Sequence, residues 1–135
     1  RYVDYYLDDA RLVVVGFGSS GRIALSAVRA ARAEGIPVGL IRPISVSPFP
    51  SKVIEEISQH VDRFLVVEMN AGQMLDDVLL AVKDNAAVDF YGRMGGVTPY
   101  TEEILDEIRR LAKEPLSPGG NPRQRWLKRM TTLNL

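Results

Sequence analysis

The stretch "LVVVGFGSSGR" at residues 12–22 decides the fold of this chain. Four apolar residues run directly into three glycines, and Gly16, Gly18 and Gly21 have the spacing G-x-G-x-x-G. Consecutive valines without polar alternation are typical of a strand that is covered on both faces. After a strand and before a helix, this glycine spacing is also the fingerprint of a dinucleotide-binding turn. The stretch therefore predicts a buried strand followed by a helix, and it raises the question whether the glycines bind a nucleotide.

Short β-rich runs alternate with amphipathic helical patterns along most of the chain. Strands are predicted at 11–17, 37–43, 63–69 and 86–92. After each of them apolar residues recur at helical spacing, and the last helix is predicted to begin near Thr98-Pro99. Such strict alternation predicts an α/β fold, in which a mostly parallel sheet of four to five strands has helices on both faces. Residues 2–7, "YVDYYL", predict an additional edge strand.

Charge is balanced in number but not in position. The chain has 17 basic and 17 acidic residues, yet residues 115–135 hold four basic residues and no acidic one. This segment is also rich in proline and glycine, so we expect an α/β domain at 1–114 and a basic C-terminal extension at 115–135. A solvated tail is the favoured interpretation, and docking on an acidic surface is the alternative. Trp126 is expected to pack on the domain or on a partner.

The composition excludes several kinds of site. The chain has no cysteine and one histidine, His60. The absence of cysteine excludes disulfides, thiolate zinc sites, catalytic thiols and cysteine-ligated iron–sulfur clusters within this chain. A catalytic relay that depends on histidine could use only His60. No basic stripe with interleaved aromatic residues points to nucleic acid, and no apolar run approaches a membrane span. We expect a cytoplasmic protein without a metal site, and the opening at Arg1 favours a piece of a longer chain.

The glycine turn allows two interpretations. A dinucleotide site needs an acidic residue about 20 positions further on, but Arg42 occupies the end of the second predicted strand. An arginine there fits the 2′-phosphate of NADP, so one alternative is a free-standing Rossmann-type module that binds NADP through Gly16, Gly18, Gly21 and Arg42. The other is structural: the first two glycines make a tight turn, and the third lets helix and strand approach closely.

Polar residues gather where the third predicted strand ends and a helix begins. "EMNAGQM" at 68–74 places Glu68, Asn70 and Gln73 beside unpaired helix N–H groups, which could meet an anion or the carbonyls of a partner. In the structural interpretation, Asn70 caps the helix and Glu68 pairs with Arg42 or Arg93. The acidic pairs on the helices are interpreted as solvated faces, so no catalytic residue is predicted.

Three ordered motifs, taken together, resemble the α subunit of 2-oxoacid:ferredoxin oxidoreductases, above all those that act on 2-oxoglutarate or 2-oxoisovalerate. They are "RPISVSPFP" at 42–50, "EMNAGQM" at 68–74 and "YGRMGG" at 91–96, and the likeness covers residues 8–110. We expect their residues to shape the face toward a neighbouring domain or subunit. In an alternative they face coenzyme A, with polar contacts from Arg93 or Arg42. The motif residues concerned are Arg42, Pro43, Pro48, Phe49, Pro50, Glu68, Asn70, Gly72, Gln73, Arg93, Gly95 and Gly96.

The same resemblance implies the fold and the role of the chain. The domain is similar to the transketolase C-terminal domain, a three-layer α/β/α sandwich whose first strand is antiparallel, and it is not active alone. The family's enzymes decarboxylate a 2-oxoacid oxidatively with coenzyme A, forming acyl-CoA and CO₂ and passing electrons to ferredoxin. Thiamine diphosphate, Mg²⁺ and an iron–sulfur cluster are expected in other parts of the enzyme. The expected partners are the rest of the α subunit, the β subunit and ferredoxin.

Overall fold

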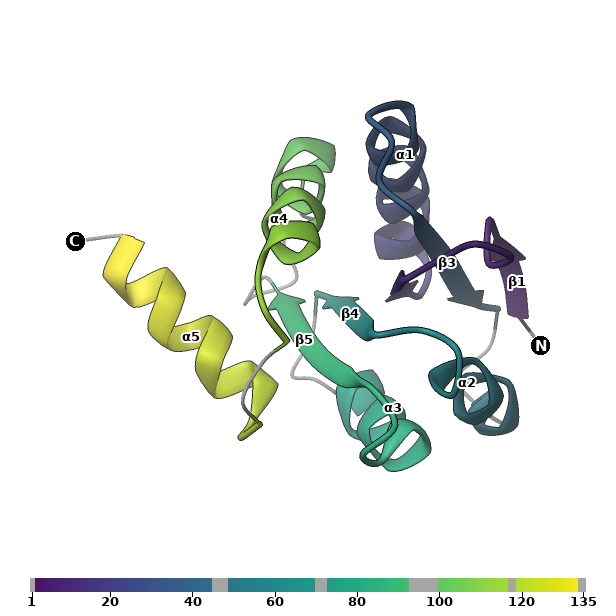
Figure 1. Cartoon of the computed structure of the whole chain (residues 1–135). Coiled ribbons are helices and arrows are strands. Elements are labelled where there is room, and N and C mark those ends of the chain that lie inside the picture. Colours follow the sequence, from purple (N-terminus) through teal and green to yellow (C-terminus); the bar gives the residue numbers. More distant parts are fainter. Residues whose placement is uncertain (1, 45–48, 70–72, 93–99, 117–118, 134–135) are drawn as a thin grey trace.

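The structure, a computed structural model, describes residues 2–44, 49–69, 73–92, 100–116 and 119–133, without the side chains of Gln73 and Leu133. Five strands in these segments form one sheet in the order β1-β3-β2-β4-β5 (Figure 1). They are β1 (Tyr2–Tyr5), β2 (Leu12–Gly16), β3 (Val38–Pro43), β4 (Arg63–Glu68) and β5 (Ala87–Gly92). β2 to β5 are parallel, whereas β1 runs antiparallel to β3 with Val3 opposite Arg42. The predicted mixed sheet with an antiparallel first strand is confirmed.

Helices cover both faces of this sheet. α1 (Ser19–Ala33) packs beside α4 (Thr101–Lys113) on one face, and α2 (Ser51–Ser58) packs beside α3 (Gln73–Val82) on the other (Figure 1). The predicted three-layer α/β/α sandwich is thereby confirmed. α4 begins at Thr101, two residues after Pro99 of the Thr98-Pro99 start that the sequence predicts, and that dipeptide lies outside the described residues.

The core lies between these layers and is centred on the two middle strands. Val13, Val14 and Val15 of β2 are fully buried, as is the run 64–67 of β4. Strands buried on both faces lose the polar alternation of a half-exposed strand, which explains the unbroken valines of the opening stretch. Each side chain of this kind stabilises the fold by about 1.5–3 kcal/mol when it is withdrawn from water.

A fifth helix, α5 (Pro122–Leu133), was not predicted from the sequence. It lies beside β5, at the end of the sheet opposite β1 (Figure 1). Asn121 caps it: its side-chain Oδ1 accepts hydrogen bonds from the backbone N–H groups of Arg123 and Gln124 at 2.9 and 3.1 Å. Pro122 then occupies the first helical position, where a proline is well tolerated. The helix therefore has a clear local start signal, "NP", inside a segment that otherwise looks irregular.

Candidate functional site

A cavity of about 710 Å³ lies at the carboxyl ends of the parallel strands. It lies beyond the ends of the paired strands β2 and β4, where the strand order reverses: the chain continues from β2 to β3 on one side of this pair and from β4 to β5 on the other. Open α/β sheets bind their ligands at such a switch in strand order. Its described lining is Phe17, Gly18, Ser19, Ser20, Phe49, Val67, Glu68, Met69, Met74, Asp76 and Asp77.

The three glycines of the opening motif each have a structural reason. Gly18 has a φ of +62°, a conformation that residues with a Cβ rarely adopt, and its carbonyl accepts the N–H groups of Gly21 and Arg22 at 3.0 and 3.3 Å. A Cβ on Gly16 would lie 3.1 Å from the Gly21 Cα, and a Cβ on Gly21 would lie 2.8 Å from the Gly16 carbonyl oxygen. The glycines therefore make a sharp turn and a close contact between strand and helix, and neither feature requires a nucleotide.

Arg42 extends over the start of α1 from its place on β3. A Cβ on Gly21 would lie 2.7 Å from Arg42 Cγ and 2.9 Å from its Cδ, so the stem of the arginine fills the space that the glycine leaves. Its Nε is buried and has no hydrogen-bond partner. The predicted ion pair between Glu68 and Arg42 is not formed.

Glu68 instead caps the helix that borders the cavity. Its Oε1 accepts the backbone N–H of Met74 and its Oε2 accepts that of Leu75, both at 3.0 Å. These N–H groups belong to the first turn of α3, where a carboxylate also interacts favourably with the helix dipole. Burial of the side chain raises the pKa of Glu68 above its ordinary value, and the two hydrogen bonds and the positive charge of Arg123 oppose that rise. Glu68 is therefore a structural carboxylate.

The other predicted site residues are only partly within the described chain. Pro43 ends β3 and is buried, and Phe49 and Pro50 are half-buried directly before α2. Gln73 is the first residue of α3. Pro48, Asn70, Gly72, Arg93, Gly95 and Gly96 lie outside the described residues. Their roles at an interface or toward coenzyme A stay predictions.

The described segments hold neither a cluster of metal ligands nor a membrane-spanning helix. No group of three His, Cys, Asp or Glu side chains there could hold a metal ion. None of the described helices is long and apolar enough to cross a membrane.

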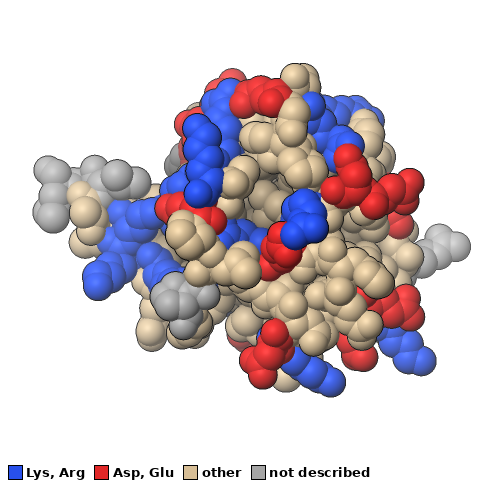
Figure 2. All heavy atoms as spheres, viewed as in Figure 1, with Lys and Arg blue, Asp and Glu red and all other residues tan. Residues whose placement is uncertain are grey.

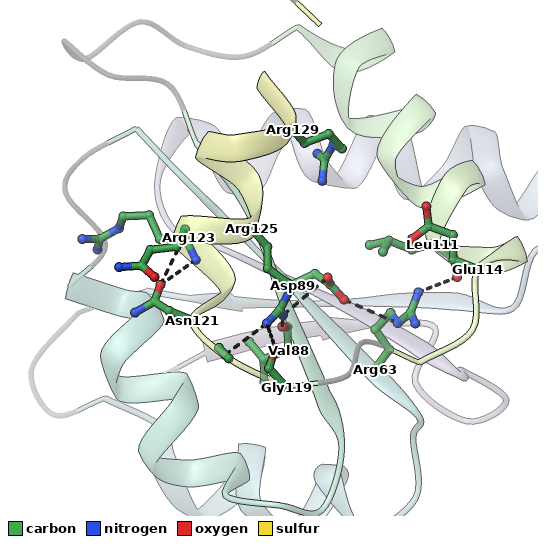
Figure 3. Close-up of polar contacts among 12 residues, drawn as sticks. Arg63, Val88, Asp89, Leu111, Glu114, Gly119, Asn121, Arg123, Arg125 and Arg129 are labelled. Atoms are coloured by element: carbon green, nitrogen blue, oxygen red, sulfur yellow. Dashed lines mark hydrogen bonds and ion pairs between the residues drawn. The ribbon is translucent and has the colours of Figure 1, made fainter. Parts of the chain in front are cut away.

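Sequence reasoning missed a buried ionic cluster at the other end of the sheet. Arg63, 3% exposed at the start of β4, donates to the carbonyls of Leu111 and Pro115, both at 2.7 Å. Its Nε lies 3.5 Å from Oδ2 of Asp89 on β5, and a nitrogen of Arg125 on α5 lies 3.8 Å from the other oxygen. Figure 3 shows the two arginines approaching Asp89 from opposite sides. The cluster joins β4, β5, α5 and the end of α4.

The basic extension is docked rather than solvated. Arg129 of α5 pairs with the buried Glu107 of α4, and Trp126 packs edge-on against Phe90 of β5. Figure 2 shows the basic side chains gathered over α5 at one end of the molecule. The sequence signal for this docking is the unequal distribution of charge. The basic segment 115–135 and the acidic remainder of the chain are expected to attract each other.

The comparison with protein families matches residues 10–104 to the pyruvate:ferredoxin oxidoreductase core domain II. The ketoisovalerate oxidoreductase subunit VorB of Methanothermobacter thermautotrophicus is 46% identical over 112 residues, which are 83% of this chain and 32% of that protein. The 2-oxoglutarate synthase subunit KorA of Methanothermobacter marburgensis is 36% identical over 103 residues, 76% of this chain and 28% of the relative. The chain thus spans about a third of the length of these curated relatives.

Solved structures show the same fold. The 2-oxoglutarate:ferredoxin oxidoreductase from Magnetococcus marinus, solved with 2-oxoglutarate, coenzyme A and succinyl-CoA bound, superposes with a TM-score of 0.72 at 18% identity, over 84% of this chain and 20% of that one. A split-gene transketolase superposes with a TM-score of 0.65 at 14% identity, over 80% and 41% of the two chains. The transketolase-like architecture and the resemblance seen in the three motifs are confirmed. The chain belongs to the pyruvate:ferredoxin oxidoreductase core domain II family.

Proposed function

We propose that this chain is the non-catalytic C-terminal domain of the α subunit of a thiamine-diphosphate-dependent 2-oxoacid:ferredoxin oxidoreductase, and that it serves domain packing and subunit assembly. The match over residues 10–104 carries the proposal, because it spans all four parallel strands and the cavity. The identity of 46% to a ketoisovalerate oxidoreductase subunit supports it. The complete enzyme would decarboxylate a 2-oxoacid oxidatively with coenzyme A, giving acyl-CoA and CO₂, with electrons passing to ferredoxin.

We propose the domain limits 1–114 for the transketolase-like domain and 115–135 for the basic extension. The family match ends at residue 104, within α4, and the proline- and glycine-rich segment begins soon after that helix. α5 would then be an addition that folds back onto the domain.

The described residues of the cavity do not fit thiamine diphosphate. The charged side chains that line it are Glu68, Asp76 and Asp77, all of which are carboxylates. They would repel a diphosphate, and two of the Glu68 hydrogen-bonding positions are already used by α3. The absence of cysteine equally leaves no thiolate ligand for an iron–sulfur cluster. We therefore assign thiamine diphosphate, Mg²⁺ and the cluster to other parts of the enzyme and derive no chemical step from this chain.

The rim of the cavity is suited to packing against another protein surface. Phe17 is 39% exposed there, and the half-buried Met69 and the buried Met74 line the cavity beside it. An exposed aromatic side chain such as that of Phe17 is a typical anchor of protein interfaces. The acidic side chains beside it favour a partner segment that combines an apolar side chain with a basic one. We propose that this face docks on the rest of the α subunit or on the β subunit.

The test uses the complete oxidoreductase that contains this chain. Phe17→Asp is compared with Leu80→Asp, which makes the same change at a residue of α3 that is 74% exposed and does not line the cavity. Phe17→Asp should lower the fraction of assembled complex about tenfold in native mass spectrometry, corresponding to a loss of about 1.4 kcal/mol, whereas Leu80→Asp should leave assembly unchanged. Melting of the variant chains monitors folding.

Two readouts of the same enzyme separate assembly from chemistry. Complex that still assembles with Phe17→Asp should reduce ferredoxin, with a 2-oxoacid and coenzyme A, at the unaltered rate per complex. Full assembly with a slower reaction would place the cavity in the chemistry and overturn the packing role. The absence of any 2-oxoacid-dependent ferredoxin reduction in the unaltered complex would overturn the enzymatic assignment itself.

A further inference from the structure

β5 ends the sheet, with a hydrogen-bonded neighbour, β4, on one side among the described strands. The free side of an edge strand presents backbone N–H and C=O groups to which another strand can add. The sequence of β5, "AVDFYG", contains β-branched and aromatic residues that favour strand pairing. A protein with such an edge needs a means of keeping further strands away.

α5 lies along this edge (Figure 1). The side chain of Arg125 donates a hydrogen bond of 2.6 Å to the backbone carbonyl of Val88 in β5. It also donates to the carbonyls of Gly119 and Gly120, at 2.6 and 3.0 Å, in the segment that leads into the helix. A guanidinium therefore takes the place that the N–H of an additional strand would have beside Val88.

The position of Trp126 independently places the helix beside the strand. Its ring centroid lies 5.3 Å from that of Phe90 and 6.2 Å from that of Tyr91, and the side chain is 6% exposed. Successive side chains of a strand point to opposite faces of the sheet. A ring in contact with two successive residues therefore lies at the edge of the strand and not on one face.

Charged contacts also hold α5 beside the strand, because the helix is mostly polar and has few apolar side chains to bury. Arg129 pairs with Glu107 of α4, and Arg125 lies 3.8 Å from Asp89 of β5. Both carboxylates are buried, so these contacts are less weakened by solvent than surface pairs are. Arg123 adds a cation–π contact, 5.7 Å from the centre of the Phe90 ring.

We infer that α5 is an edge cover that keeps a second copy of this chain from pairing with β5. Arg125 satisfies the backbone, Trp126 shields the edge side chains, and Arg129 fixes the helix to α4. The family match ends at residue 104, so α5 lies outside the matched residues. This inference does not depend on the proposed enzymatic function.

The test compares two double variants of the full chain. Arg125→Gln with Trp126→Ala removes both contacts to the edge. Lys128→Gln with Leu127→Ala makes matched changes at exposed residues of the same helix. Hydrogen–deuterium exchange of the β5 and β2 amides, and sedimentation velocity over a wide range of protein concentration, are measured for both.

In dilute solution the first variant should exchange its β5 amides about tenfold faster or more, while the β2 amides stay protected. At high concentration it should form dimers in which the β5 amides are protected again. The control variant should behave like the unaltered chain in both measurements.

Each other outcome overturns the inference. A first variant that stays monomeric at every concentration shows that the edge does not accept a second copy. Association that leaves the β5 amides unprotected shows that another surface is responsible. If the double variant unfolds, Arg125→Gln alone is tested in its place. If the β2 and β5 amides exchange faster to the same extent in both the double and the single variant, α5 is part of the folding core and not a cover.

Discussion

The aliphatic part of Arg42 lies against Gly21, so closely that a Cβ on the glycine would stand 2.7 Å from Arg42 Cγ. The third glycine of a dinucleotide motif ordinarily allows the helix and strand to approach each other. Here it allows that contact and also makes room for an arginine stem. The residue that the NADP alternative assigns to a phosphate is therefore, in its stem, a packing partner of the motif.

Gly21→Ala should destabilise the chain by about 2 kcal/mol, because the new methyl group meets the backbone of Gly16 as well as Arg42. In an Arg42→Ala background the cost should fall but not vanish, since the contact of 2.8 Å with the Gly16 carbonyl oxygen remains. Urea unfolding of the four chains of this double-mutant cycle measures both values. An identical cost in the two backgrounds would show that Arg42 does not restrict the site.

NADPH should not bind this chain in the micromolar range, since the glycines are explained by packing. Isothermal titration of the chain with NADPH measures this directly. Micromolar binding that Gly18→Val or Arg42→Glu abolishes would establish the NADP alternative and contradict the assembly role.

Glu68 should give the chain a characteristic dependence of stability on pH. Its pKa in the folded chain is raised above the ordinary value of 4.5, so the folded state binds the proton more tightly than the unfolded state does. The contribution of this residue is therefore fully present below pH 4.5, and it is lost as the pH rises through the raised pKa. The free energy of unfolding should fall over that window on account of this carboxyl.

Glu68→Gln should remove this part of the pH dependence, because the amide does not titrate. Urea unfolding at a series of pH values from 4 upward, compared with the unaltered chain, isolates the contribution. Glu55→Gln, at an exposed position of α2, is the matched control and should leave the profile unchanged. A wild-type profile in Glu68→Gln would contradict the assignment of the pH dependence to this carboxyl.

Arg63→Met should destabilise the chain by about 3–5 kcal/mol. The substitution leaves Asp89 buried with one cationic neighbour fewer, and it removes two hydrogen bonds to backbone carbonyls. Arg11→Met is the comparison: the Arg11 side chain is 65% exposed and pairs with Asp62 at the surface, so its loss should cost less than about 1 kcal/mol. An equal loss of stability for the two variants in thermal unfolding would show that burial of the cluster does not increase its contribution to stability.

The sequence was sufficient for the sheet, and the reason is local. An unbroken apolar run such as 12–15 is compatible with a strand covered on both faces, and the glycines after it require a tight turn. The predicted strands agree with the observed ones to within a residue or so at each end. These features depend on neighbours in the chain and can be recognised there.

The errors concern contacts between distant residues. In the structural interpretation Glu68 pairs with Arg42 or Arg93. The pair with Arg42 is not formed, and Arg93 lies outside the described residues. Glu68 accepts hydrogen bonds from the first turn of α3, a contact that depends on how β4 and α3 meet. α5 was missed because its residues are mostly polar and the apolar contact that fixes Trp126 comes from β5, 36 positions earlier at Phe90. Only the Asn121 cap is a local signal of this helix, and it stands among prolines and glycines that are typical of irregular structure.

The carboxylate of Glu68 has a consequence for the affinity of the proposed docking face. It fastens the end of β4 to the beginning of α3, so two walls of the cavity are held in one arrangement before any partner arrives. A surface that is ordered beforehand loses little conformational entropy on binding, and more of the contact energy remains as affinity. This part of the cavity wall is therefore preorganised for binding, and the ordering on binding would fall mainly on the side chains of the partner.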